Sequence, residues 1–429
     1  MKKFFLFAIV IAALALPLVL YARVRMAEAA WARSFGPLEQ FPDRYHSEKN
    51  ETADMLSGWI AAVGVHVPGD KIPIDPPPAE VLAAVRKYIE DQFASTSSRP
   101  LAPPPSVERY VLGRARLFDS MAADMRHLPP PSWPIEYGPA GYAPNFLPLI
   151  QLHKFLLAAA LVRDRRGDHA GGEELLLASW KLNQSLRERP EFVAHVVATS
   201  IFRMQILAMR HMSVDPNSWR KRLLEHDYRA SLVTASQSDT YRTTRAIKTN
   251  IYADARFIDE ERAISAQMGW TLGARPRWKI LLTTPIRWLD LPALMESSRQ
   301  LLVAGQKRPI DETADLAVAY QRGLSQWFYV PDPDVASSDI SGTFKRLDRL
   351  LNEAELTEKV LIARAAREAN GGRWPKSIPG FETSQITNGH WIYEASAGGI
   401  LIRFSREVRW PDSLLGNSSP LQYTTISSS

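Results

Sequence analysis

The first residues of this chain constrain its architecture more than any other segment. Lys2 and Lys3 precede an uncharged run from Phe4 to Ala22, and Arg23 follows it directly. The 19 residues of this run rise roughly 28 Å as an α-helix, close to the hydrocarbon thickness of a bilayer. The run lacks the polar face that a helix on the surface of a soluble core normally shows. We therefore predict a signal anchor, a transmembrane segment, within residues 1–30.

A cleaved secretory signal is the alternative interpretation of the same segment. Ala27-Glu28-Ala29 has the small-residue pattern of a cleavage site, but the apolar run before it is longer than that of a usual signal peptide. Its length favours an uncleaved anchor. Positive charges flank the run on both sides, so their bias does not fix the orientation. Since a lone N-terminal anchor usually exports a long downstream domain, we expect a single-pass inner-membrane protein with a periplasmic body.

The composition is that of a folded protein and excludes several kinds of site. Hydrophobic residues make up 45% of the 429 residues and charged residues 23%, unlike a disordered chain. The sequence has no cysteine, which excludes disulfides, zinc–thiolate sites, iron–sulfur clusters and cysteine nucleophiles. A net charge of +6 is small for this length, so we expect no nucleic-acid partner.

Helical spacing of apolar residues dominates the rest of the chain and predicts a mainly α fold. We assign residues 31–148 to N-terminal helices with proline-rich loops. The loops are Ile72–Pro78, Ser95–Pro105 and Pro129–Pro148. Between the last two, the pattern predicts one helix over Val107–Met125.

Residues 149–340 are predicted to form a helical body. Two amphipathic segments meet at Gly167-Asp168, which indicates a helical hairpin. This hairpin loosely resembles one tetratricopeptide unit, without a second copy at the same period. The apolar helix Glu191–Met212 follows. Further on, Pro276–Pro292 is apolar but too short to span a bilayer. We predict a buried helix or a membrane-surface contact there, with burial favoured, separate from a helix over Met295–Gln306.

Residues 341–429 are predicted to form a small α+β module. A long helix over Phe344–Asn370 ends at Gly371-Gly372, which supply a left-handed stop. Trp374 can then fold back on this helix. Two alternating segments, His390–Ala395 and Ile400–Phe404, predict a β-hairpin, and a tail follows.

The order of these elements resembles the globular part of type II secretion pseudopilins. The resemblance covers residues 344–404 and is carried by the helix, the Gly372-Arg373-Trp374-Pro375 stop and the hairpin. It implies an accessory role in a secretion or pilus system. Two features of that family are missing: Lys3-Phe4 lacks the glycine of the N-terminal processing site, and no Asp-Pro-Trp-Gly segment follows Trp374.

The sequence contains no motif specific for catalysis or cofactors. It has no Gly-x-Ser-x-Gly, His-Glu-x-x-His, P-loop or Gly-x-Gly-x-x-Gly. We therefore assign no catalytic, cofactor-binding or metal residue and predict no cofactor. Asp259-Glu260-Glu261 is an acidic patch that we interpret as a solvated helix face. The stripe Arg242, Arg245 and Lys248 could meet an anionic glycan or lipid, but a solvated or ion-paired helix face is the favoured interpretation.

These features favour a non-enzymatic role, although they leave catalysis open. The leading prediction is scaffolding or protein interaction at the membrane, through a helical-repeat-like surface and with an envelope protein as partner. One alternative is a hydrolase or transferase acting on envelope polymers. The other is the accessory role in secretion or pilus assembly that the C-terminal resemblance implies.

Overall fold

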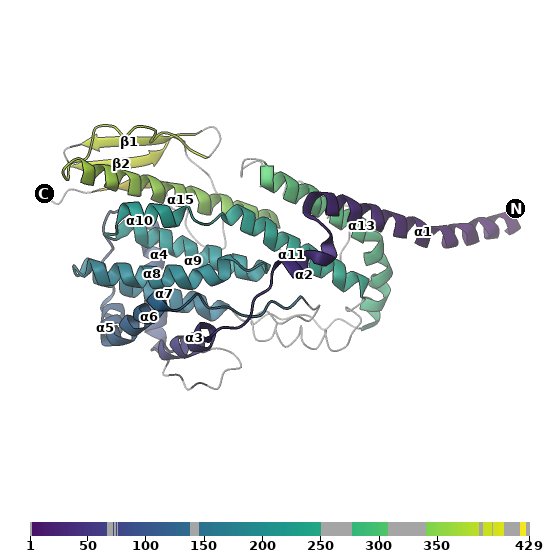
Figure 1. Ribbon diagram of the computed structural model, residues 1–429, viewed down its shortest axis with the longest axis horizontal. Helices are drawn as coiled ribbons and strands as arrows, with labels where there is room; N and C mark the ends of the chain where they lie inside the picture. The colour runs from purple at the N-terminus through teal and green to yellow at the C-terminus, as the bar shows by residue number, and fades with distance from the viewer. Residues whose placement is uncertain are drawn as a thin grey trace.

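The protein is mainly helical, with one small antiparallel sheet near its C-terminus (Figure 1). The computed structural model describes residues 2–66, 72, 74, 76–137, 146–249, 277–307, 340–385, 389–396, 398–406 and 421–425. The N-terminal helix projects from one end of the molecule, and the sheet lies at the opposite end. The predicted mainly α class with a C-terminal β-hairpin is confirmed.

The helices vary widely in length, and the strands are short. In chain order the helices are α1 (Lys2–Phe35), η1 (Leu38–Gln40), α2 (Phe41–Arg44), α3 (Glu51–Ala62), α4 (Ala79–Ala94), α5 (Pro105–Gly113), α6 (Ala115–His127), α7 (Leu147–Arg165), α8 (His169–Arg187), α9 (Phe192–His211), α10 (Pro216–Leu223), α11 (Tyr228–Lys248), α13 (Arg277–Lys307) and α15 (Ile340–Ala369). The strands are β1 (Trp391–Ser396), β2 (Gly399–Phe404) and β3 (Gln422–Thr424).

The main core lies between α7, α8 and α9. Leu156, Leu175 and Ile201, one from each helix, are fully buried in it. The hairpin between α7 and α8 turns at Gly167, which takes φ +90°, a conformation that glycine adopts without strain. Asp168 then caps α8 by accepting a hydrogen bond from the amide of Gly171 at 3.0 Å. The predicted helical hairpin is therefore confirmed.

Helix α9 runs through the middle of this core. Among the residues whose side chains are described, it is the one helix long and apolar enough to cross a membrane, and 67% of that segment is buried inside the protein. Such burial is typical of the central helix of a globular core. Most of the predicted N-terminal span, Phe4–Ala22, lies outside the residues whose side chains are described.

The single helix predicted over Val107–Met125 is wrong, because the chain breaks between α5 and α6. Arg114 leaves the helical conformation at φ −111° and ψ 19°, next to the weak helix former Gly113. The break redirects the chain, so that α5 packs on α7 while α6 packs on α8. The guanidinium of Arg114 lies 4.2 Å over the ring of Tyr110, where it covers the turn.

A second layer joins α1, α11 and α13. Trp31 of α1 and Leu291 and Met295 of α13 are buried together there. The predicted separation between Pro276–Pro292 and Met295–Gln306 is wrong, because α13 is one helix that bends but continues. A proline removes one hydrogen bond and kinks a helix, and the contacts of α13 with α1 and α11 support the continuous helix.

Helix α15 packs on α9 and α10 and carries the sheet on its far side. Strands β1 and β2 form the predicted hairpin, with Trp391 opposite Phe404. The third strand, β3, pairs antiparallel with β2 and was not predicted. Together with the end of α15, the sheet positions the groove described next.

Candidate functional site

The last turns of α15 form one wall of a groove. Gly371 and Gly372 take φ of +63° and +81° and end the helix as predicted. The Arg367 Nε donates a hydrogen bond to the Gly372 carbonyl at 2.8 Å, and its guanidinium lies 4.8 Å from the ring centroid of Trp374. Trp374 therefore folds back on α15, and this stack orients the Arg367 side chain along the wall.

The link between α9 and α10 forms the opposite wall. Asp215 caps α10 by accepting hydrogen bonds from the amides of Asn217 and Ser218 at 3.3 and 3.1 Å. Its carboxylate is thus already partnered by backbone donors. Ser213 lies exposed just before it, so this wall presents a hydroxyl and a capped carboxylate.

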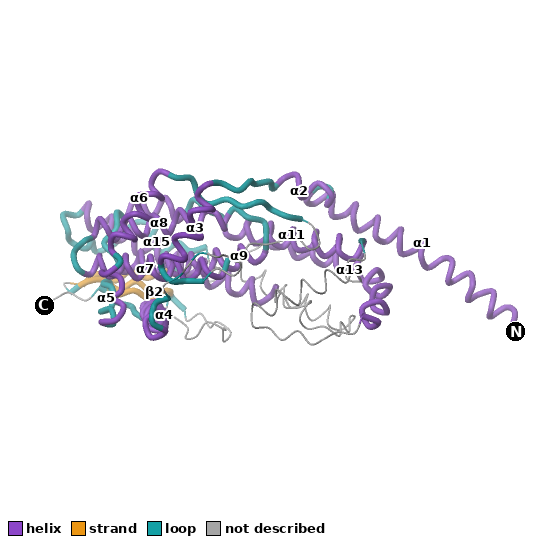
Figure 2. Tube along the Cα trace, turned by 90° about the horizontal axis from the view of Figure 1, so that it is seen from below, coloured by secondary structure: helices purple, strands orange, loops and turns teal. Residues whose placement is uncertain are grey.

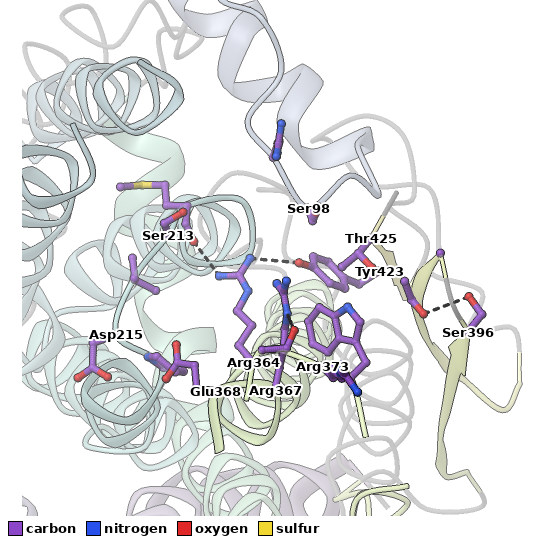
Figure 3. Close-up of a pocket in the computed structure, with 18 residues that line it drawn as sticks. Ser98, Ser213, Asp215, Arg364, Arg367, Glu368, Arg373, Ser396, Tyr423 and Thr425 are labelled. Atoms are coloured by element: carbon purple, nitrogen blue, oxygen red, sulfur yellow. Dashed lines mark hydrogen bonds between the residues drawn. The ribbon is translucent and has the colours of Figure 1, made fainter. Parts of the chain in front are cut away.

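Arg364 connects the two walls across the floor. Its guanidinium donates to the carbonyls of Met209 at 3.1 Å and Met212 at 2.7 Å, and also to the carbonyl of Arg210. These carbonyls belong to the C-terminal turn of α9, where the helix leaves them without helical partners. A further bond at 3.1 Å reaches the hydroxyl of Tyr423 (Figure 3). Arg364 is therefore a structural link between α9, α15 and β3.

The sheet and the segment after α4 close the remaining sides. The amide of Thr424 donates to the carbonyl of Thr96 at 2.9 Å, which places Ser98 and Arg99 at the groove. The tip of the β-hairpin contributes Gly398 and Gly399. Gly399 lies so close to Thr425 that a Cβ at this position would collide with the Thr425 carbonyl oxygen, so only glycine fits there.

The resulting groove has a volume of about 1160 Å³. Four of its lining residues are arginines and two are acids, namely Arg99, Arg364, Arg367, Arg373, Asp215 and Glu368. No lysine lines it within the described part of the chain. The side chains converge on the groove from elements that are far apart in the sequence (Figure 3).

More positive charge lies buried behind the floor, at the contact between α9 and α15. Glu353 accepts hydrogen bonds from Arg203 at 2.6 and 2.8 Å and from Arg349 at 3.0 Å. Burial alone would raise the pKa of Glu353, but the charge and hydrogen bonds of Arg203 outweigh it and keep this pKa below its ordinary value. Arg210, also buried, has its pKa lowered to about 10 by desolvation. Glu353 thus pairs with two arginines and interacts electrostatically with a third, Arg210.

The basic stripe singled out in the sequence lies elsewhere and is used internally. Arg242 donates to the carbonyl of Glu136 at 2.7 Å, and Arg245 to the carbonyl of Tyr137 at 3.3 Å. Lys248 pairs with Glu28 of α1 and lies 3.6 Å from Glu39. The favoured interpretation, an ion-paired face, is confirmed for Lys248. The acidic patch Asp259-Glu260-Glu261 lies outside the described residues.

Several histidines are buried in the helical core as neutral rings. His153 and His195 are nearly inaccessible to solvent. The two ring nitrogens of His211 lie 2.7 Å and 3.2 Å from the carbonyl oxygens of Ser97 and Gln92, and the neutral ring donates to one of them. Within the described ranges, no group of three or more His, Cys, Asp or Glu side chains is placed to hold a metal ion. What the groove offers chemically is a set of cationic, planar hydrogen-bond donors around an open volume.

Sequence reasoning missed the groove residues Arg99 and Arg373. Arg373 lies in the Gly372-Arg373-Trp374-Pro375 segment, which predicts a helix stop and a turn. The signal that could have indicated Arg373 is its positive charge beside a predicted helix end and an aromatic residue.

Comparisons of the chain with known protein families, with curated proteins and with solved structures found no match.

Proposed function

We propose that this protein is a membrane-anchored scaffold that holds a partner protein in the cell envelope. Helix α1 is its single inner-membrane anchor, and the helical body lies on the periplasmic side. The proposal joins the apolar N-terminal run to an open, cationic groove at the other end of the molecule.

The observation that carries the proposal is the division of α1 into two parts. Its C-terminal part is packed into the body, where Trp31 is 2% exposed. Before that part, Leu18 is 72% and Val19 54% exposed, and the helix projects away from the body (Figure 2). Apolar surface in water costs about 25 cal/mol per Å², so the exposed apolar side chains of Leu18 and Val19 favour insertion into a bilayer.

The body supports a binding role. The groove has two carboxyl groups, and one of them, that of Asp215, caps α10. The arginines around them suit recognition of an anionic partner better than acid–base chemistry. An accessory role in secretion or pilus assembly is a second candidate, favoured by the order of α15, the glycine stop and the β-hairpin.

Fractionation and a topology reporter test the anchor. The full chain should stay in bacterial membranes after alkaline carbonate extraction, and alkaline phosphatase fused to its C-terminus should be active. The substitutions Val10→Arg and Leu14→Arg together should release the protein, because each charge at the centre of a span costs about 2.5–3.5 kcal/mol. Met26→Arg and Ala29→Arg, at exposed positions beyond the run, serve as the matched control.

Each result bears directly on the proposal. Membrane retention with an active phosphatase fusion, lost in the first variant and kept in the control, supports it. Full extraction of the wild-type chain by carbonate would contradict the anchor. A retained but inactive fusion would contradict the periplasmic placement.

A further inference from the structure

We propose that the groove beside α15 binds an acidic, extended polypeptide segment of the partner protein. The inference rests on the proposed scaffold function and names the chemistry of its partner. It is carried by the free arginines, the buried charge behind the floor, the mixed polarity of the lining and the place of the groove in the molecule.

The free cations lie at the rim. Arg99 and Arg373 are exposed, and neither makes an ion pair or side-chain hydrogen bond in the part of the chain that the structure describes. Arg367 uses its Nε on Gly372 and is held flat against Trp374. Arginine presents a planar fork that matches a carboxylate with two parallel hydrogen bonds. The rim is therefore suited to carboxylates held at fixed positions.

The floor adds a field of the same sign. Buried Arg210 interacts electrostatically with Tyr423 and with Glu353, the carboxylate that pairs with Arg203 and Arg349 further along α15. The Nε of Arg210 and one of its terminal nitrogens have no hydrogen-bond partner among the described residues. Arg364 adds a further charge at the floor itself. Buried charges are weakly screened by salt, so Arg210 and Arg364 strengthen the attraction of the groove for anions.

The lining favours a peptide over a uniformly anionic polymer. Glu368 is exposed among the arginines and would repel an evenly spaced row of phosphates. Ser396 and Thr425 supply hydroxyls, and Gly398 at the hairpin tip leaves its backbone accessible. An extended peptide offers its own amides and carbonyls to such groups between its acidic side chains. A phosphate backbone offers acceptors alone.

The position of the groove argues against lipid headgroups as the ligand. The sheet and the end of α15 lie at the opposite end of the molecule from α1 (Figure 1). With α1 in the membrane, the groove faces away from the bilayer that holds the protein. A segment of another protein in the same compartment can reach it.

Fluorescence anisotropy on the full chain in non-ionic detergent tests the proposal. The probe is a fluorescein-labelled peptide in which Asp and Glu alternate with Ala and Ser, and its comparison is the same peptide with Asn and Gln in place of the acids. We expect the acidic peptide to bind, with an affinity that falls as salt rises. The affinity of the amide peptide should be lower by about tenfold or more, because it lacks the charge-assisted hydrogen bonds.

A double charge reversal locates the binding. Arg99→Glu with Arg373→Glu should weaken the acidic peptide by about tenfold or more, since two attractive contacts become repulsive. Arg109→Glu with Arg116→Glu is the matched control: both residues are exposed, lie on α5 and α6 outside the groove, and change the net charge equally. Equal melting temperatures of the two variants show that the fold is kept.

The outcomes separate this inference from the anchor. Loss of peptide binding in the groove variant alone supports it, whatever the fractionation result. No binding of the acidic peptide, or equal losses in both variants, would overturn it and leave the anchor standing. A single-stranded oligonucleotide or a polygalacturonate oligomer that outcompetes the peptide, with its binding lost in the groove variant, would also overturn the peptide assignment.

Discussion

Acid should unfold this protein through the histidines of its helical core. Burial lowers the pKa of His153 and of His195 to about 3, and lowers that of His211 to about 4. Their ordinary value is 6.5. Between these values the unfolded chain takes up a proton on each ring while the folded chain does not. Their neutral state therefore supports the fold fully above about pH 6.5, and this support is lost as the pH falls below that value.

The loss is comparable with the stability of a whole domain. One pKa unit corresponds to about 1.4 kcal/mol, so at about pH 5 each ring costs about 2 kcal/mol and three rings about 6 kcal/mol. Total unfolding free energies are usually about 5–15 kcal/mol. We expect the urea midpoint of the full chain, followed by helical circular dichroism in non-ionic detergent, to fall steeply between about pH 7.5 and pH 5.

His195 offers the sharpest variant. Neither of its ring nitrogens has a hydrogen-bond partner among the described residues, so leucine can replace it without leaving a buried polar group unpaired. His195→Leu should gain about 2 kcal/mol relative to wild type on going from about pH 7.5 to pH 5. His127→Leu, at an exposed ring on α6, is the control and should keep the wild-type pH slope.

Two results would refute the reasoning. The free energy of unfolding of the wild type could stay constant as the pH falls. The buried histidines would then take up protons in the folded chain as readily as in the unfolded chain. If the stability of His195→Leu fell with pH as steeply as that of the wild type, His195 would not contribute to the acid sensitivity.

Three further substitutions test the packing around the groove. Glu353→Gln should destabilise the protein by about 3–5 kcal/mol, because it leaves buried arginines without their counter-charge; urea unfolding measures this, and a change under about 1 kcal/mol would contradict the shared-carboxylate arrangement. Arg364→Met should cost about 2–3 kcal/mol by removing the bonds to the last carbonyls of α9, and limited proteolysis should then cut near Met212 first. Gly399→Ala should cost about 1–3 kcal/mol, because the added Cβ meets the Thr425 carbonyl; an unchanged melting temperature would show that β2 and β3 can separate there freely.

The elements that local chemistry specifies were predictable from the sequence. Gly167-Asp168 is both a turn and a helix cap, and Gly371-Gly372 supply the positive φ that ends α15. The β1–β2 hairpin follows from alternation around a glycine-containing turn. In each case the residues that determine the structure are neighbours in the chain.

Elements that depend on distant partners were not predictable in this way. The break at Arg114 exists because α5 and α6 pack on different helices, and α13 continues through Pro292 because α1 and α11 support it. Strand β3 is three residues long, too short to show alternation. The groove joins Arg99, Asp215 and Arg373 from well-separated segments, and no local pattern links them.

If α1 anchors the protein as proposed, its seating on the body fixes how far the groove stands from the membrane. Val24 and Trp31 are buried against α13, Ser34 accepts a hydrogen bond from Arg299 at 3.3 Å, and Lys248 pairs with Glu28. The helix therefore enters the body without a flexible linker and acts as a rigid support. Under the proposed topology, a partner would meet the groove at one set height above the bilayer, so recognition would select partners by reach as well as by charge.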